Sequence, residues 1–259
     1  MCESADSHQH SLSSRRTFIR SSTAAAAVGL LAACRAEPPA TKPAESAVAQ
    51  EPSVVALTRE ARDQLTADQI VQKWKDGNQR FREGRKIQRD FLAEQQATAA
   101  GQYPAGVLLS CIDSRAPAEI LFNLGMGDVF NARVAGNVDN PDILGSMEFT
   151  TKLAGAKVIL VMGHSACGAV AGAIAGAQLG NLTQLLAKIQ PAIAATTYAG
   201  DRSAANPEFV DAVARKNVEL TMDSIRKHSP VISELEKAGA VKIVGAFYDL
   251  KTGAVDFFT

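Results

Sequence analysis

Two cysteines and one histidine are the residues of this sequence best suited to chemistry. Cys111 ends the apolar run in "LLSCIDSRAP" and is followed at once by Asp113 and Arg115. Further along, "GHSACG" places His164 three residues before Cys167. One imidazole and two thiols form a ligand set suited to zinc, provided that the two segments lie side by side.

Other interpretations of these residues stay open from the pattern alone. A lone histidine near an apolar strand is commonly a core residue, and a lone cysteine commonly acts as a small buried hydrophobe. Once Cys2 and Cys34 are assigned to an N-terminal export segment, Cys111 and Cys167 are the pair left to form a disulfide. The metal interpretation gains weight because His164 is one of only two histidines outside that segment.

The elements that must position these residues alternate between apolar strands and helices. Near-continuous runs of Val, Ile and Leu with helical crossovers predict an α/β domain built on a mainly parallel β-sheet flanked by helices. The closing "TGAVDFFT" follows a Thr-Gly turn and predicts an antiparallel edge strand. Upstream, residues 58–100 predict an N-terminal helical arm, with a capping-box pattern at Thr66 and Gln69 and a second helix N-cap at Asp90. The predicted strands are 106–110, 127–132, 157–162 and 241–248, and the later helices are 141–154, 166–177 and 206–228.

The candidate residues fall at strand ends in this scheme. Cys111 follows one predicted strand, and His164 with Cys167 follows another. Ligands of such sheets bind outside the carboxyl ends of the strands, so this is where a site is expected.

The first 33 residues predict an export signal rather than fold. Paired Arg15 and Arg16 precede a weakly apolar, Ala-rich segment that is too short to span a bilayer as an ordinary helix, which is typical of twin-arginine signals. The sequence at residues 31–34 resembles the lipobox of bacterial lipoproteins, in which Cys34 would be lipidated, although simple cleavage is an alternative. We therefore expect a periplasmic or cell-envelope protein whose only membrane attachment would be that lipid.

The remaining chain predicts one folded domain behind a tether. Residues 34–55 are rich in Ala, Pro, Glu and Lys and predict a flexible tether, so the domain should cover residues 56–259. With 27 basic and 27 acidic residues and no basic block beyond the signal, a nucleic-acid partner is not expected. A small or neutral partner fits this composition better.

Two motifs together resemble the zinc-binding signatures of the β-class carbonic anhydrases. "CIDSR" and "GHSACG" begin 52 residues apart, at Cys111 and Gly163. "RVAGN" at residues 133–137, "GSMEF" at 145–149 and "VGAFYDLKTGAV" at 244–255 are similar to the family as well, so the resemblance covers roughly residues 66–258. It implies the β-carbonic anhydrase fold and the reversible hydration of carbon dioxide to bicarbonate and a proton.

The resemblance also implies roles for the motif residues. Cys111, His164 and Cys167 would ligate zinc, with the fourth position open to water or closed by Asp113. In the family the aspartate accepts a hydrogen bond from the water at the metal, and the arginine holds the aspartate off the metal. These roles map to Asp113 and Arg115, for which the alternative is a surface ion pair of little value.

Two further residues are carried over from the resemblance. Gln102 lies nine residues before Cys111, as does a substrate-orienting glutamine of open-site family members, and Phe130 matches an apolar wall position. The alternative for Gln102 is a polar loop residue, and the alternative for Phe130 is a residue of the hydrophobic core. Because family members are built on dimers that often pair into tetramers, the resemblance implies a homodimer or homotetramer.

Three other functions are alternatives to carbon dioxide hydration. A non-catalytic zinc-binding protein on the same fold is disfavoured by the Asp113–Arg115 pair, and hydrolysis of a related small molecule such as carbon disulfide stays open. A zinc deaminase is set aside, because its His-x-Glu and Pro-Cys-x-x-Cys patterns are absent. His228, near a helix end, is interpreted as a surface residue rather than a proton shuttle.

Overall fold

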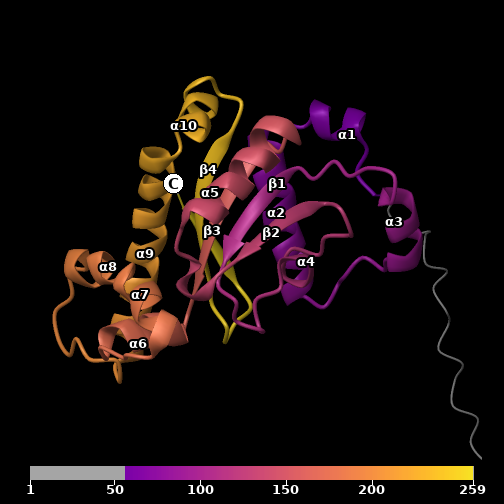
Figure 1. Ribbon diagram of the computed structural model, residues 1–259. Helices are drawn as coiled ribbons and strands as arrows, with labels where there is room; N and C mark the ends of the chain where they lie inside the picture. Colours follow the sequence, from indigo (N-terminus) through magenta and orange to yellow (C-terminus); the bar gives the residue numbers. More distant parts are fainter. Residues whose placement is uncertain (1–55, 259) are drawn as a thin grey trace, which may run out of the picture. The chain divides into compact units, whose positions relative to one another are not determined.

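A five-stranded sheet forms the centre of the fold (Figure 1). The structure is a computed structural model that describes residues 56–258, so the predicted signal, the tether and Cys34 lie outside the described residues. The strand order is β2-β1-β3-β4-β5, with the first four strands parallel and β5 antiparallel to β4. The predicted fold class, including the antiparallel edge strand, is therefore confirmed. The strands are β1 (Gly106–Ser110), β2 (Val129–Arg133), β3 (Val158–His164), β4 (Lys242–Tyr248) and β5 (Val255–Phe258).

Helices cover both faces of the sheet, which explains why its central strands are apolar throughout. On one face, Leu108 and Leu160 pack against α2 and α4. On the other face, Leu109 and Val161 pack against α5, α9 and α10. These helices are α2 (Ala67–Arg82), α4 (Ala118–Leu121), α5 (Pro141–Glu148), α9 (Pro207–His228) and α10 (Pro230–Lys237).

The N-terminal arm packs through close contacts of helix α2. The capping box predicted at Thr66 and Gln69 is present, with both reciprocal hydrogen bonds formed. Gly77 brings α2 against the loop after α4, since a Cβ at this position would lie 1.8 Å from the Phe122 carbonyl oxygen. The predicted cap at Asp90 is also formed, and it begins a helix that ends before Gly101. The other arm helices are α1 (Arg59–Gln64) and α3 (Phe91–Thr98).

A third apolar cluster lies beyond the carboxyl ends of the strands. It joins Cys111 and Cys167 to the first half of α9 and to three short helices. Those helices form the lobe seen below the sheet in Figure 1. They are α6 (Gly168–Ile174), α7 (Gly180–Ala187) and α8 (Gln190–Ala195).

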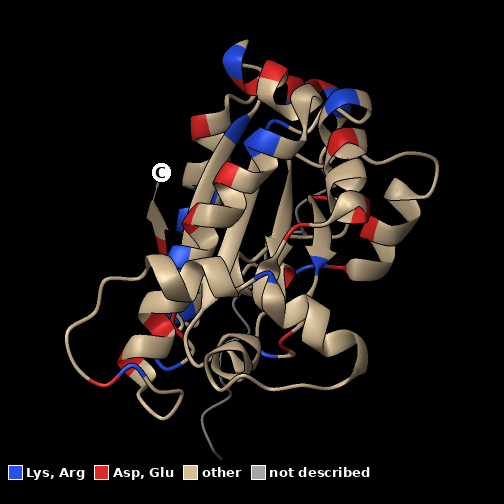
Figure 2. Cartoon of the chain, turned by 60° about the vertical axis from the view of Figure 1, so that its left-hand side comes forward, with Lys and Arg blue, Asp and Glu red and all other residues tan. Residues whose placement is uncertain are grey.

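The remaining elements differ from the sequence-based expectation in detail. The helix predicted over residues 141–154 ends as α5 at Glu148 and continues as a π-helical segment, η2 (Phe149–Leu153). A short turn, η1 (Ala135–Asn137), follows β2. Lys, Arg, Asp and Glu are interspersed over the elements seen in Figure 2. None of the described helices is both long and apolar enough to cross a membrane.

Candidate metal centre

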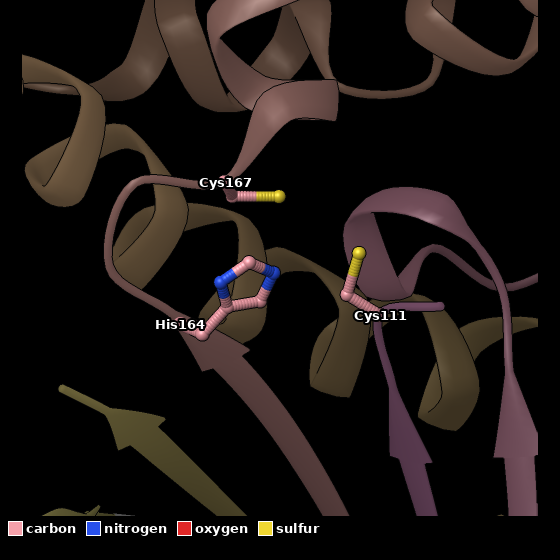
Figure 3. A group of neighbouring side chains, drawn as sticks. All are labelled: Cys111, His164 and Cys167. Atoms are coloured by element: carbon pink, nitrogen blue, oxygen red, sulfur yellow. The ribbon is translucent and has the colours of Figure 1, made fainter. Parts of the chain in front are cut away.

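Cys111, His164 and Cys167 converge at the carboxyl ends of two adjacent strands (Figure 3). β1 and β3 pair in parallel up to Ser110 and Met162, so the residues that follow in each strand meet at one edge. Cys111 comes directly after β1, His164 ends β3, and Cys167 is the N-cap of α6. All three side chains are buried, and their ligand atoms lie within 4.8 Å of one another. This spacing suits one metal ion shared by all three.

The histidine presents an unused nitrogen to the cluster. His164 Nδ1 lies 2.9 Å from the carbonyl oxygen of Ser165. Because that oxygen can only accept, Nδ1 carries the ring proton and donates a hydrogen bond to it. Nε2 is buried and has no hydrogen-bond partner among the described residues. A neutral imidazole oriented by a backbone carbonyl through one nitrogen is how metal-binding histidines are usually held. His164 therefore fits a metal ligand better than a satisfied core residue.

The two thiols are free and affect each other's ionisation. Neither cysteine of the described chain forms a disulfide, which removes the disulfide interpretation for this structure. A hydrogen bond from Cys167 lowers the pKa of Cys111, and the same interaction, together with burial, raises the pKa of Cys167. The pair therefore holds one thiolate readily, which is the form that binds metal. The Gly136 N–H also donates to Cys111 Sγ at 3.4 Å.

Asp113 is held by Arg115 beside this cluster. The Arg115 Nε and Nη2 donate to Asp113 Oδ1 and Oδ2 at 2.9 and 2.7 Å, and the Arg115 backbone N–H donates to Oδ1 at 2.9 Å. These bonds keep the pKa of Asp113 well below its usual range, so the carboxylate is ionised. Asp113 Oδ2 lies 3.9 Å from His164 Nε2, next to the metal-ligand atoms. With both oxygens bound by Arg115, the carboxylate is held in the orientation expected of an uncapped site.

Arg133 fixes the loop that carries Cys111 and Asp113. Its Nε donates to the Cys111 carbonyl at 2.9 Å, and its Nη2 donates to the Asp113 carbonyl. Sequence reasoning noted the motif that begins at Arg133 but gave the side chain no role. The partners lie 22 and 20 residues away in sequence, so no local pattern indicated these contacts.

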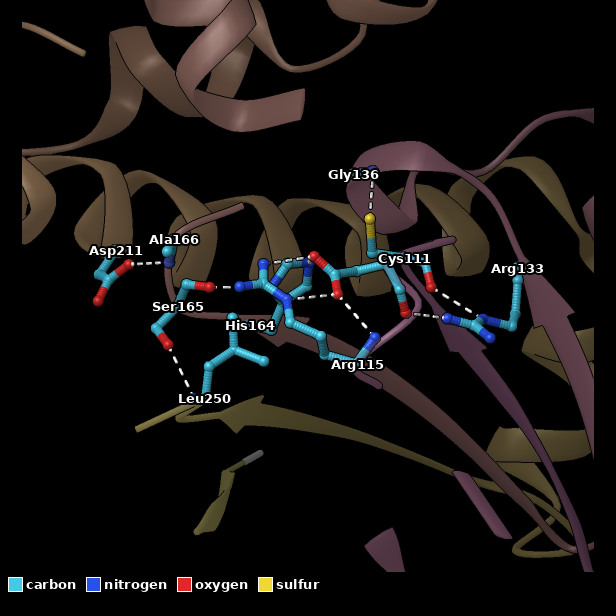
Figure 4. Close-up of polar contacts among 10 residues, drawn as sticks. Cys111, Arg115, Arg133, Gly136, His164, Ser165, Ala166, Asp211 and Leu250 are labelled. Carbon is cyan, nitrogen blue, oxygen red and sulfur yellow. Dashed lines mark hydrogen bonds and ion pairs between the residues drawn. The ribbon is translucent and has the colours of Figure 1, made fainter. Parts of the chain in front are cut away.

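Asp211 supports the turn between His164 and Cys167. Ala166 in this turn has a φ of 52°, a left-handed conformation that is unfavourable for a residue with a Cβ. Its N–H donates to Asp211 Oδ1 on α9 at 2.9 Å, as Figure 4 shows. Ser165 adds further anchors, since its N–H donates to the Tyr248 carbonyl and its Oγ accepts from the Leu250 N–H, both at 2.9 Å. Sequence reasoning missed Asp211, which lies 45 residues from Ala166.

The comparison with known proteins agrees with this geometry. The model of the carbonic anhydrase family matches residues 106–255. The chain belongs to the β-class carbonic anhydrase family. It is 35% identical to carbonic anhydrase 2 of Mycobacterium tuberculosis, with 69% of this chain and 86% of the relative aligned. It is 32% identical to a carbonic anhydrase of Mycolicibacterium smegmatis, over 70% of this chain and 88% of the relative.

Solved β-carbonic anhydrases share the fold. One from Coccomyxa, in complex with acetazolamide, superposes with a TM-score of 0.57 at 26% identity and covers 62% of this chain and 74% of its own. One of two tetrameric enzymes from Sordaria macrospora superposes with a TM-score of 0.55 at 27% identity, covering 62% and 83%. The metal-ligand set and the Asp113–Arg115 pair thus occur on the fold of a carbonic anhydrase.

Two residues carried over from the family lie away from the metal centre of their own chain. Gln102 is exposed and precedes β1, whereas Cys111 follows the same strand. Phe130 is half-buried on β2, where its ring lies 6.5 Å from that of Phe149, at an edge-to-face angle of 73°. Their predicted roles in substrate binding stay predictions, which a single chain does not test.

His228 lies where the sequence predicted a surface residue. It is the last residue of α9 and its side chain is exposed. Its Nδ1 is 3.0 Å from Ser224 Oγ on the same helix. None of these contacts involves the metal-ligand cluster.

Proposed function

We propose that this chain catalyses the reversible hydration of carbon dioxide to bicarbonate and a proton, using zinc held by Cys111, His164 and Cys167. The observation that carries the proposal is the buried Cys-His-Cys cluster beside an arginine-bound aspartate, in a member of the β-class carbonic anhydrase family. Two thiolates and one imidazole are a zinc ligand set that leaves a position for a reactant.

The chemistry divides between the metal and the side chains around it. When bound, zinc lowers the pKa of a water molecule from about 15.7 to about 7, which makes hydroxide available near neutral pH. Asp113 accepts a hydrogen bond from the attacking water, which turns an oxygen lone pair toward the carbon of carbon dioxide. Arg115 keeps Asp113 ionised and holds both of its oxygens. The planar guanidinium suits this two-point contact better than a lysine would.

Asp113 matters more here than it would beside three neutral ligands. Two thiolates offset the charge of a divalent metal and weaken it as a Lewis acid, so groups around the ligands carry more of the orientation. The carboxylate of Asp113 is 3.9 Å from His164 Nε2, close enough to the cluster for this role.

The proposal extends to assembly and location. We propose a homodimer or homotetramer in which Gln102 and Phe130 contact the substrate bound to another copy. The tetrameric relatives from Sordaria macrospora support an oligomer. Large apolar side chains also stay exposed on one chain, among them Phe149 at 53% and Leu153 at 77%. Export by the twin-arginine route to the periplasm or cell envelope, with a lipid on Cys34, rests on the sequence of residues 1–34 alone.

One assay tests the proposed activity directly. The mature chain loaded with zinc should accelerate carbon dioxide hydration in a stopped-flow measurement with a pH indicator. Cys167→Ser should lose bound zinc and activity together, because it removes one of three metal ligands. Wild-type protein with one zinc per chain and no acceleration above buffer would overturn the proposal. The same protein offered carbon disulfide would show whether this related substrate is hydrolysed instead.

A further inference from the structure

A chain of two hydrogen bonds connects helix α9 to the thiolate of Cys111. Asn217 Nδ2 on α9 donates to the Gly136 carbonyl oxygen at 2.7 Å. The N–H of the same glycine donates to Cys111 Sγ at 3.4 Å, as Figure 4 shows. In the sequence, Gly136 lies 81 residues before Asn217 and 25 residues after Cys111.

The geometry fixes the orientation of the Asn217 amide. A carbonyl oxygen can only accept, so the nitrogen of the amide must face Gly136. The residue is 3% exposed, which means that no solvent competes for this bond. An unmade bond at such a buried carbonyl costs about 1–3 kcal/mol, so Asn217 strongly favours the observed position of Gly136.

The turn that Asn217 holds has an unfavourable backbone. Gly136 has a φ of 71° and Asn137 a φ of 44°, so two successive residues are left-handed. A Cβ on Gly136 would lie 2.7 Å from Ile189 Cδ1, so a larger residue would have to displace that side chain. Such conformations persist only where surrounding contacts hold them. The bond from Asn217 is one of these contacts.

The N–H of Gly136 matters because its acceptor is a metal-ligand atom. A hydrogen bond to a thiolate withdraws electron density from sulfur and weakens its donation to a bound metal. With two thiolates in the ligand set, this donation strongly affects the charge left on the metal. The position of Gly136 therefore tunes the metal centre.

We propose that Asn217 is a positioning residue of the metal centre, which acts by holding the Gly136 N–H on Cys111 Sγ. The inference rests on the proposed metal binding by Cys111, and not on the identity of the substrate. Asn217 contacts neither the metal ligands nor the substrate position directly, so it acts through Gly136.

The test compares two buried asparagines in the full mature chain loaded with cobalt(II). Asn217→Ala removes the donor to Gly136. Asn78→Ala is the matched control, since Asn78 is 4% exposed and donates to the Leu121 and Gly253 carbonyls at 3.2 and 3.0 Å. Both variants lose buried hydrogen bonds from an amide to a carbonyl, but only the bond made by Asn217 is connected to Cys111.

We expect the thiolate-to-cobalt charge-transfer band to move to lower energy in Asn217→Ala and to stay at the wild-type position in Asn78→Ala. Zinc affinity, measured by competition with a chelator, should fall about 10- to 100-fold in the first variant only, because the loss of the contact that orients Cys111 outweighs the stronger donation from its sulfur. Asn217→Leu, which keeps the size but has no donor, should show the same band shift if Asn217→Ala does not fold.

Two outcomes separate this inference from the proposed function. An unmoved band and unchanged affinity in folded Asn217→Ala or Asn217→Leu would overturn the positioning role, whatever the activity of the wild type. A wild-type chain that shows the cobalt band but does not hydrate carbon dioxide would overturn the proposed function. The band position and zinc affinity of the variants would still decide the positioning role. Equal band shifts in the variants of Asn217 and Asn78 would also overturn the inference.

Discussion

At the scale of single residues, the state of Asp113 is set by its neighbour. Arg115 binds both carboxylate oxygens, and 57% of the arginine side chain is exposed. A surface ion pair of this kind contributes little to stability. Under the proposed function, its position 3.9 Å from His164 Nε2 gives the pair a different use, because it would orient an acceptor beside the reacting water.

We predict that Asp113→Asn keeps zinc but hydrates carbon dioxide about 100-fold or more slowly. The three ligand atoms are untouched, whereas the amide no longer offers two anionic oxygens to Arg115 and to water. Metal analysis and stopped-flow hydration on the same sample check both parts. Cys167→Ser is the control that should lose metal and activity together, and loss of zinc from Asp113→Asn would show that Asp113 holds the metal itself.

Asp211 leads to a prediction about pH. Burial raises the pKa of Asp211 above its usual 3.8, and the bond from Ala166 opposes this shift. Because the pKa is higher in the folded state, the contribution of Asp211 to stability is fully present below pH 3.8 and is lost as pH rises through the folded-state value. Asp211→Asn keeps an oxygen acceptor for the Ala166 N–H, and because the amide does not ionise, it does not lose stability as the pH rises.

We therefore expect the stability of Asp211→Asn relative to wild type to increase between pH 4 and pH 7, with hydration retained. Asp211→Ala removes the acceptor from Ala166, whose φ is 52°, and should lose both metal affinity and hydration. Urea unfolding at the two pH values and metal competition provide the measurements. If Asn and Ala impaired the site equally, the charge of Asp211 rather than its acceptor oxygen would be what matters.

The sequence could reveal the Cys-His-Cys cluster but not the residues that support it. His164 and Cys167 are three residues apart, and they and Cys111 come at the ends of apolar strands, so local pattern and strand ends were enough to predict that the three side chains meet. Arg133, Asp211 and Asn217 act on partners 20–81 residues away. A polar residue on a helix has many uses, and only the folded chain shows which carbonyl or N–H it meets.

At the scale of elements, α9 is the helix that supports the candidate metal centre through side-chain hydrogen bonds. It contacts the turn between His164 and Cys167 through Asp211 and the turn at Gly136 through Asn217, and it lies closely against β3. Gly163 permits this approach, since a Cβ there would lie 2.8 Å from Val218 Cγ2 and 3.3 Å from the Ala214 carbonyl oxygen.

We predict that Gly163→Ala destabilises the fold by about 1–3 kcal/mol, because the added methyl group overpacks the contact between β3 and α9. Gly172→Ala on α6 is the matched control, since its Cβ would lie 3.5 Å from Leu186 Cδ1, an ordinary contact. In a helix this change should stabilise by up to about 1 kcal/mol. Urea unfolding of both variants decides the matter, and equal stabilities would mean that α9 can shift without cost.

Strands were predictable from the sequence where burial on both faces requires a continuous run of apolar residues. The strand β1 has the predicted bounds and β4 begins one residue later than predicted, because strands buried on both faces are apolar throughout. Helices α4, α7, α8 and α10 were not predicted. They are short, and α7 and α8 belong to a lobe whose packing partners lie on distant helices. The π-helical segment η2 was missed because its residues continue the helical pattern of α5.

At the scale of the whole molecule, residues 56–258 of one chain leave apolar surface and an open sheet edge. β2 is an edge strand, and Phe130 on it lies next to the exposed Phe149. Unpaired edge strands and grouped apolar side chains are features that an oligomer would cover. We therefore expect the mature chain to sediment as a dimer or larger oligomer, and a monomer at micromolar concentration would contradict the proposed assembly.

Gln102 provides the sharper test of assembly. It precedes β1 and Cys111 follows it, so the length of this five-residue strand, roughly 16 Å, separates them in one chain. A glutamine side chain does not bridge that length. If Gln102 orients the substrate, it must do so in the metal centre of another copy.

We predict that mixed oligomers of Gln102→Ala and Cys111→Ser recover activity that neither variant has alone. The first chain supplies an intact metal centre and the second supplies Gln102, so a dimer carrying one of each should have about half the wild-type activity. Two affinity tags allow the mixed species to be purified for stopped-flow hydration. Cys111→Ser mixed with Cys167→Ser is the control, since both of its chains lack a complete metal centre and should stay inactive. No recovery in the first mixture, with dimer formation verified, would remove Gln102 from the site, because within its own chain it lies at the opposite end of the sheet from Cys111.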